Sequence, residues 1–257
     1  MKFGLCTSLD NLKLTSNMGY DYIEPAVAGI AAMEEDDFLK AVENVKNSPI
    51  KCEVCNILFR PGIHLTSSEY DEEEIKAYLD RAFSRIVQLG THTVVFGSGG
   101  ARRVPPEVDL ARARKQFLRA AGVVGEMAAK YNLIIALEPL NKKETNLINT
   151  VREGIELVRE LNHPNVKLLA DFYHMRMENE PMSILEEAGD ILCHLHIAKG
   201  VERTYPRSSA EDIYGEFFTV LKKIGYNKGI SVEGRTENID EDGSAALKVL
   251  KELAASV

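Results

Sequence analysis

Residues 133–145 read Leu133-Ile-Ile-Ala-Leu-Glu138-Pro-Leu-Asn141-Lys-Lys-Glu144-Thr145, and the fold can be worked out from this stretch. Five consecutive apolar residues lead directly into the carboxylate of Glu138, and a proline follows it. A short apolar run rich in isoleucine is typical of a strand that is buried on both faces. A carboxylate at the end of such a strand is costly to bury alone, so Glu138 needs a cation or a hydrogen-bonding partner.

Three later segments repeat this pattern of an apolar run followed by a side chain that can bind a metal. Residues 166–171 end at Asp171, residues 191–197 carry His196, and residues 229–233 end at Glu233. Four successive strands therefore each deliver one metal-type ligand at the C-terminal end.

Two histidines compete for the ligand position in the third of these segments. His194 and His196 are two residues apart, so their side chains point to the same side of a strand. His196 lies nearer the C-terminal end of the strand. We therefore take His196 as the ligand and place His194 one layer below it.

Strand and helix patterns alternate along the whole chain. Strands are expected at residues 2–6, 20–24, 50–57, 92–96, 133–138, 166–171, 191–197 and 229–233, and helices at residues 9–18, 34–47, 72–89, 107–131, 151–161, 181–188, 212–224 and 244–255. This order predicts a parallel sheet with right-handed crossovers. Eight such units in 257 residues favour an α/β fold with one domain over residues 1–257, a single (β/α)8 TIM barrel. The alternative is an open doubly wound sheet, but the first strand is not followed by a Gly-x-Gly-x-x-Gly turn.

Composition excludes several classes of protein. The formal net charge is −8, which disfavours a nucleic-acid partner because binding a phosphate backbone requires a basic surface. No apolar run approaches the roughly 20 residues of a membrane span, so no membrane partner is expected. The first residues read as a strand and not as a signal peptide, so we expect a cytoplasmic protein. Cys52 and Cys55 have redox-pair spacing but lie in a strand-like run, where we expect two small buried side chains.

Three carboxylates and one imidazole suit a hard divalent cation. Mn²⁺ or Mg²⁺ fits best, and Co²⁺ or Zn²⁺ is possible. Such a cation holds two adjacent oxygens of a sugar or hydroxy-ketone, polarises the carbonyl and stabilises an enediolate. Carboxylates nearby can then move protons at carbon as general acid and base.

The motifs together resemble the xylose-isomerase-like barrel family of sugar isomerases and epimerases, and most closely the ketose 3-epimerases of the tagatose and psicose type. The resemblance covers the whole chain, and its specific motifs lie in the second half. They are Leu137-Glu138-Pro-Leu-Asn141-x-x-Glu144-Thr145-Asn146, Asp171-x-x-His174, His194-Leu-His196 followed by Arg203, and Ser231-Val-Glu233-Gly.

The resemblance implies a role for each of seven residues. Glu138, Asp171, His196 and Glu233 would bind one divalent metal ion, most closely matching Mn²⁺. Glu138 and Glu233 would also exchange the C3 proton of a ketose on its two faces, and Glu144, His174 and Arg203 would bind the substrate. Arg203 follows His196 by seven residues, one more than in the 3-epimerases, so Arg207 or Arg235 is an alternative. The expected partner is a small sugar or sugar phosphate, and relatives suggest a homodimer or homotetramer.

Other functions remain open on the same fold. They are inosose isomerase or dehydratase, hydroxypyruvate isomerase, dehydroshikimate dehydratase, a nuclease like endonuclease IV, and a non-catalytic sugar-binding protein. Glu24 either reaches the site or forms a salt bridge at its rim. Residues 97–100 with Arg102 and Arg103 could cradle a phosphate, although a tight loop with solvated arginines is the simpler expectation. No helix is expected to begin at Asp171.

Overall fold

A computed structural model describes residues 1–256 of the chain. Eight parallel strands form one sheet in the order β2-β1-β8-β7-β6-β5-β4-β3. Isolated bridges join Tyr22 to Lys51 and Ala26 to Asn56, so the two outer strands of that order meet and the sheet curls into a barrel. The predicted (β/α)8 barrel is confirmed. The strands are β1 Lys2–Cys6, β2 Tyr22–Glu24, β3 Val54–Cys55, β4 Thr93–Phe96, β5 Ile134–Leu137, β6 Val166–Asp171, β7 Leu192–Ile197 and β8 Gly229–Val232.

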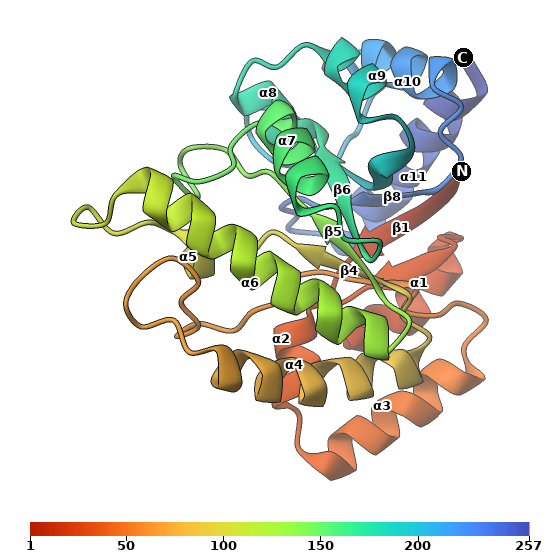
Figure 1. Cartoon of the computed structure of the whole chain (residues 1–257). Coiled ribbons are helices and arrows are strands. Elements are labelled where there is room, and N and C mark those ends of the chain that lie inside the picture. Colours follow the sequence, from red (N-terminus) through yellow and green to blue (C-terminus); the bar gives the residue numbers. More distant parts are fainter. Residues whose placement is uncertain (257) are drawn as a thin grey trace.

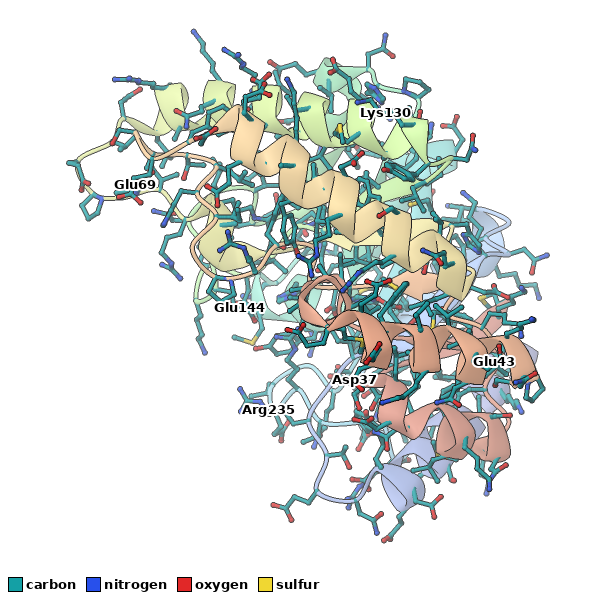
Figure 2. All side chains as sticks on the ribbon, turned by 90° about the horizontal axis from the view of Figure 1, so that it is seen from below. Asp37, Glu43, Glu69, Lys130, Glu144 and Arg235 are labelled. Carbon is teal, nitrogen blue, oxygen red and sulfur yellow. The ribbon has the colours of Figure 1, made fainter. Side chains whose placement is uncertain are left out.

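Helices cover the outside of the barrel (Figure 1). They are α1 Leu12–Met18, α2 Val27–Ala32, α3 Glu35–Asn47, α4 Glu72–Ile86, α5 Gly99–Arg102, α6 Leu110–Lys130, α7 Val151–Leu161, α8 Phe172–Met177, α9 Leu185–Ala188, α10 Tyr214–Lys223 and α11 Ile239–Ser256. Short 3-10 turns lie at residues 9–11, 87–89, 182–184 and 189–191. Charged side chains such as Glu43, Glu69 and Lys130 project away from this layer into solvent (Figure 2). Among residues 1–256, none of the helices has both the length and the apolar character that crossing a bilayer requires.

Local sequence signals explain where the helices begin and end. Gly19 has a φ of 88° and closes α1, a backbone conformation that glycine adopts without a steric penalty. Thr150 and Glu153 form a capping box at the start of α7, in which each side chain satisfies a backbone N–H of the other.

The barrel interior is layered by the two-residue period of its strands. Tyr22, Val54, Val95, Ala136 and Leu169 form a buried cluster separate from the main core between sheet and helices. Residues two positions apart on a strand share a face. The residues two positions after Tyr22, Ala136 and Leu169 are Glu24, Glu138 and Asp171, which therefore lie above this cluster at the C-terminal mouth of the barrel.

Several expected elements differ from the structure. The helices α2, α5 and α8 were not expected, and α11 begins at Ile239 instead of residue 244. The third strand is confined to Val54–Cys55, although residues 50–57 were expected to be extended. The pair Cys52 and Cys55 is buried and unbonded to each other, as expected.

Candidate metal centre and adjoining cavity

Four side chains from four strands converge at the mouth of the barrel. Glu138 follows β5, Asp171 is the last residue of β6, His196 lies in β7, and Glu233 follows β8. One donor atom from each of the four lies within 4.8 Å of the others. Glu138, Asp171 and His196 are buried, and Glu233 is half-buried. The sequence prediction named this same group, and three carboxylates with one imidazole form a donor set that suits a divalent cation.

The His196 ring lies between the carboxylates of Glu138 and Glu233 on one side and the carboxylate of Glu24 on the other. Its Nδ1 lies 3.1 Å from Glu138 Oε1 and 3.5 Å from Glu233 Oε2. Its Nε2 lies 2.8 Å from Oε1 of Glu24. Glu24 is completely buried and its other oxygen lies 3.0 Å from Nε2 of His194. Glu24 therefore reaches the site and fixes both histidines, which excludes the alternative of a salt bridge at the rim.

Asp171 has one oxygen engaged and one free among the described residues. Its Oδ1 accepts a hydrogen bond of 2.6 Å from the backbone N–H of Tyr173, so Asp171 caps α8, contrary to the expectation that no helix begins there. Its Oδ2 is buried without a hydrogen-bond partner within residues 1–256. A buried carboxylate oxygen without a partner is rare in proteins, and a cation at this position would satisfy it.

Arg203 connects Glu233, one of the four convergent residues, to Glu144. Its Nη1 donates to Glu144 Oε1 at 2.8 Å and its Nη2 donates to Glu233 Oε2 at 2.6 Å. Its guanidinium also lies over the ring of Tyr173, at 4.9 Å from the centroid. The alternative arginines point elsewhere: Arg207 pairs with Asp242 at 2.5 Å, and Arg235 is exposed (Figure 2).

A cavity of about 560 Å³ opens beside these residues. Its lining includes Glu138, Glu144, Arg203, Glu233 and the segment 97–101. This volume lies within the range of about 300–1,000 Å³ that is usual for small-molecule sites. The lining therefore combines apolar side chains with the polar groups of the candidate metal centre and of Glu144 and Arg203.

The fold agrees with a comparison against known families. The model of the xylose isomerase-like TIM barrel family matches residues 12–253. The chain belongs to this family. The family resemblance that was inferred from the motifs is thereby confirmed.

Relatives within the xylose isomerase-like TIM barrel family include sugar epimerases. A ketose 3-epimerase from Arthrobacter globiformis is 28% identical over 176 residues, which cover 67% of this chain and 60% of that protein. An L-ribulose 3-epimerase from Methylomonas sp. (strain DH-1) is 37% identical over 143 residues, covering 54% of this chain and 49% of that protein. The matched region thus spans only about half to three-fifths of these relatives. The crystal structure of D-psicose 3-epimerase with D-tagatose from Clostridium cellulolyticum H10 superposes with a TM-score of 0.86 at 20% identity, covering 99% of each chain, and shows the same fold.

Burial and like charges shift the pKa values of the carboxyl groups at the candidate metal centre. Burial, together with the neighbouring carboxylates of Glu138 and Glu233, raises the pKa of Asp171 to about 7. Burial also raises the pKa of Glu138. Burial opposes ionisation of Glu233 as well, but the His196 imidazole and the Arg203 guanidinium outweigh it and lower the pKa of that carboxyl. The carboxylates are therefore crowded, and a cation between them would relieve their repulsion.

His174 lies in the site with a fixed orientation. Its Nδ1 accepts hydrogen bonds from Asn141, at 3.2 Å from the backbone nitrogen and 2.8 Å from the side-chain nitrogen. Its Nε2 is buried without a hydrogen-bond partner in the described part of the chain and lies 3.7 Å from Asp171 Oδ2. Burial lowers the pKa of His174 to about 3, and Arg203 contributes to this shift. The ring is therefore neutral, with its proton on Nε2.

Arg102 is buried beside the site, a position that the sequence did not predict. It was expected to be solvated in a loop, but it lies on the short helix α5 with no exposed surface. Its Nη2 donates to the backbone carbonyl of Glu138 at 2.7 Å. Arg103 is exposed and donates to the backbone carbonyls of Lys143 and Glu144. These two arginines hold the segment after β5 in place, and the hydrogen bonds that they donate go to backbone carbonyls.

Proposed function

We propose that this protein is a divalent-metal-dependent epimerase that inverts C3 of a ketose by proton transfer. The observation that carries the proposal is the convergence of Glu138, Asp171, His196 and Glu233 within 4.8 Å beside a cavity of about 560 Å³. The names of two relatives, ketose 3-epimerase and L-ribulose 3-epimerase, support the same reaction class.

The four convergent residues would hold the metal ion, and Mn²⁺ is the ion we propose, with Mg²⁺, Co²⁺ and Zn²⁺ as the other candidates. His196 would use Nδ1, because Nδ1 faces Glu138 and Glu233 whereas Nε2 faces Glu24. A carboxylate that accepts the second N–H of a ligating imidazole fixes its tautomer and orientation. When bound, a divalent cation supplies Lewis-acid polarisation of a carbonyl.

Glu138 and Glu233 would exchange the C3 proton on opposite faces of the sugar. Both carboxyl groups line the cavity, so both can reach a bound ketose. Burial favours the protonated form of Glu138, whereas Arg203 and His196 favour the ionised form of Glu233. Two carboxyl groups whose pKa values are displaced in opposite directions are suited to act as general acid and general base.

Glu144, His174 and Arg203 would hold the oxygens of the sugar. Glu144 accepts a hydrogen bond from Arg203, which leaves its second oxygen available to a sugar hydroxyl. His174 is neutral and carries a proton on the unpartnered Nε2, so it can donate to a substrate oxygen. Arg203 offers additional N–H donors from the same guanidinium.

Deuterium incorporation at C3 tests the proposal. Ketoses and ketose phosphates are incubated in D₂O with protein loaded with Mn²⁺, Mg²⁺ or Co²⁺, and the C3–H signal is followed by NMR. We expect exchange with at least one ketose, and we expect Glu233→Gln to slow it by about 10²- to 10⁴-fold, the usual contribution of a general acid or base. Glu237→Gln is the matched control, because Glu237 is exposed four residues away. Full turnover by Glu233→Gln would overturn the assignment of Glu233.

A further inference from the structure

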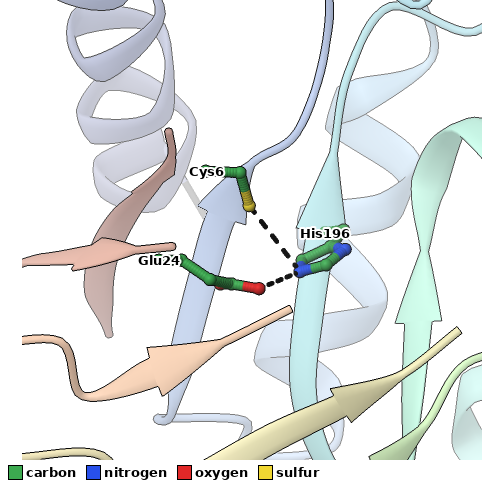
Figure 3. A group of neighbouring side chains, drawn as sticks. All are labelled: Cys6, Glu24 and His196. Carbon is green, nitrogen blue, oxygen red and sulfur yellow. Dashed lines mark hydrogen bonds and ion pairs between the residues drawn. The ribbon is translucent and has the colours of Figure 1, made fainter. Parts of the chain in front are cut away.

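A second group of metal-binding side chains lies on the other side of the His196 ring. Cys6 ends β1 and Glu24 ends β2, and both approach Nε2 of His196 (Figure 3). The Cys6 Sγ lies 3.9 Å from Nε2, and the Glu24 Oε1 lies 2.8 Å from it. The three donor atoms all lie within 4.8 Å of one another.

We propose that Cys6, Glu24 and His196 form a second metal site, selective for a thiophilic divalent cation such as Zn²⁺ or Co²⁺. Zinc bonds to sulfur, nitrogen and oxygen of about 2.0–2.3 Å place tetrahedral donors about 3–4 Å apart. The observed separations of 2.8 and 3.9 Å need only small side-chain adjustments to reach that geometry. The thiolate gives this site a preference for thiophilic cations, which the three carboxylates and one imidazole of the first site do not have.

Two of the three proposed ligands line a cavity, which would give the bound ion a position for an exchangeable ligand. This cavity, of about 370 Å³, adjoins the first one at Asn56, Ile57 and Glu233. Its wall also includes the polar residues Thr7 and Ser8 and the half-buried Glu233. Three protein ligands with one position facing a cavity is the arrangement of zinc sites that exchange their fourth ligand.

The charges at the barrel mouth leave room for a second dication. Glu138, Asp171 and Glu233 carry three negative charges, which one divalent ion and Arg203 would neutralise. Glu24 is then left as a fully buried carboxylate whose partners are the two imidazoles and Ser231. A second divalent ion would be met by negative charge from Glu24, from the thiolate of Cys6 and from the His196 ring once its Nε2 has lost its proton.

Binding at the second site would release two protons to solvent. One leaves the Cys6 thiol, and the other leaves Nε2 of His196, which would then bridge the two ions through its two nitrogens. The hydrogen bond from His196 to Glu24 would be replaced by a shared cation. If Glu24 instead only orients His196 for the first site, Cys6 has no part in metal binding, and this difference makes the proposal testable.

Cobalt spectroscopy distinguishes the two possibilities. Metal-free protein is titrated with Co²⁺, because a thiolate ligand produces an intense charge-transfer band in the near ultraviolet that carboxylates and imidazole do not give. We expect this band in the unmodified protein and in Cys193→Ser, the matched control, because Cys193 is another half-buried free cysteine outside both groups. We expect Cys6→Ser to lose the band and to bind one Co²⁺ fewer, with Cys6→Ala as a second variant if the serine substitution prevents folding.

The variant Asp171→Asn distinguishes the first site from the second. This variant is expected to lose C3 exchange but to keep the charge-transfer band, since Asp171 is not part of the second group. Absence of the band in the unmodified protein, or its persistence in Cys6→Ser and Cys6→Ala, would overturn the second site. Failure to detect C3 exchange while the band depends on Cys6 would count only against the epimerase proposal.

Discussion

Gly97 shows how closely single residues shape the candidate metal centre. It directly follows β4, and a Cβ at this position would overlap Oε2 of Glu138 and come within 3.6 Å of Leu140 Cδ2. The Glu138 carboxylate therefore occupies space that is open only because residue 97 lacks a side chain.

Gly97→Ala is expected to displace the Glu138 carboxylate and weaken metal binding. The loss should be roughly 10- to 100-fold in affinity, the range found when groups that orient metal ligands are altered. Isothermal titration calorimetry with Mn²⁺ measures it. Gly100→Ala is the control, since Gly100 is exposed and its Cβ would have no neighbour within 4 Å. Equal affinity in the two variants would show that Gly97 has no such role.

Metal affinity is expected to fall as the pH is lowered through about 7. The pKa of Asp171 is raised to about 7 by burial and by the nearby carboxylates, so below that pH its carboxyl group is protonated in the metal-free protein. An incoming cation must then displace that proton, which costs up to about tenfold in affinity per pH unit for each proton released. Calorimetric titrations at pH 6, 7 and 8 in two buffers of different ionisation enthalpy measure both effects. An affinity that does not change over this range would contradict the prediction.

The sequence located the four side chains that converge at the mouth of the barrel, but not the partners that hold them. Glu138, Asp171, His196 and Glu233 could be predicted because each ends a buried apolar run. Glu24 and His196 are 172 residues apart in the sequence, and their strands β2 and β7 are not neighbours in the sheet. The burial of Arg102 against the Glu138 carbonyl depends on a similar contact across the fold. Such contacts follow from the closed barrel and have no local signal.

At the scale of elements, the loop after β7 positions Arg203, a proposed substrate-binding residue. Arg203 has a φ of 53°, a left-handed conformation that is uncommon for residues other than glycine. A bridge between Thr204 and Arg235 holds this backbone against the segment after β8. The strain is therefore maintained by surrounding structure, as is common at functional sites, and it aims the guanidinium at Glu144 and Glu233.

Arg203→Lys is expected to lower kcat/KM by roughly 10- to 100-fold. Lysine lacks the forked guanidinium and cannot bond Glu144 and Glu233 at once, and a hydrogen bond to a charged group contributes about 1.5–3 kcal/mol. Steady-state kinetics with the best ketose measures the change. Arg207→Lys, on the same loop but paired with Asp242, should leave kcat/KM unchanged. If the Arg207 variant were the impaired one, the alternative arginine would be the correct assignment.

The elements that sequence analysis missed are those with the least periodic signal. The helices α2, α5 and α8 span six, four and six residues, too short for an amphipathic pattern to repeat. Asp171 was interpreted as a strand end only, yet it also begins α8, because one carboxylate oxygen caps the helix while the other faces the site. Long helices such as α6 were predicted to within three residues at each end.

At the scale of the whole molecule, the barrel gathers four buried or half-buried carboxylates at one mouth. Glu24, Glu138, Asp171 and Glu233 come from β2, β5, β6 and β8 or the residues that follow them. Crowded buried carboxylates destabilise the folded state unless they are protonated or paired. The folded chain should therefore be more stable with a cation than without one.

Removal of metal is expected to lower the melting temperature. A ligand that binds only the folded state adds about 2.7 kcal/mol at a free concentration of 100 times its Kd, which corresponds to roughly 5–10 °C in a domain of this size. Differential scanning calorimetry with Mn²⁺ or with a chelator measures the shift. Asp171→Asn should melt at nearly the same temperature in both conditions. If neither Mn²⁺ nor the chelator changed the melting temperature of the unmodified protein, no ion would be bound.

The position of the metal can be observed directly by anomalous diffraction at the manganese edge from crystals of the Mn²⁺-loaded protein. We predict one manganese peak bonded to Glu138, Asp171, Glu233 and Nδ1 of His196. A map without a peak between these four side chains, or with manganese bound by other residues, would contradict the proposed centre.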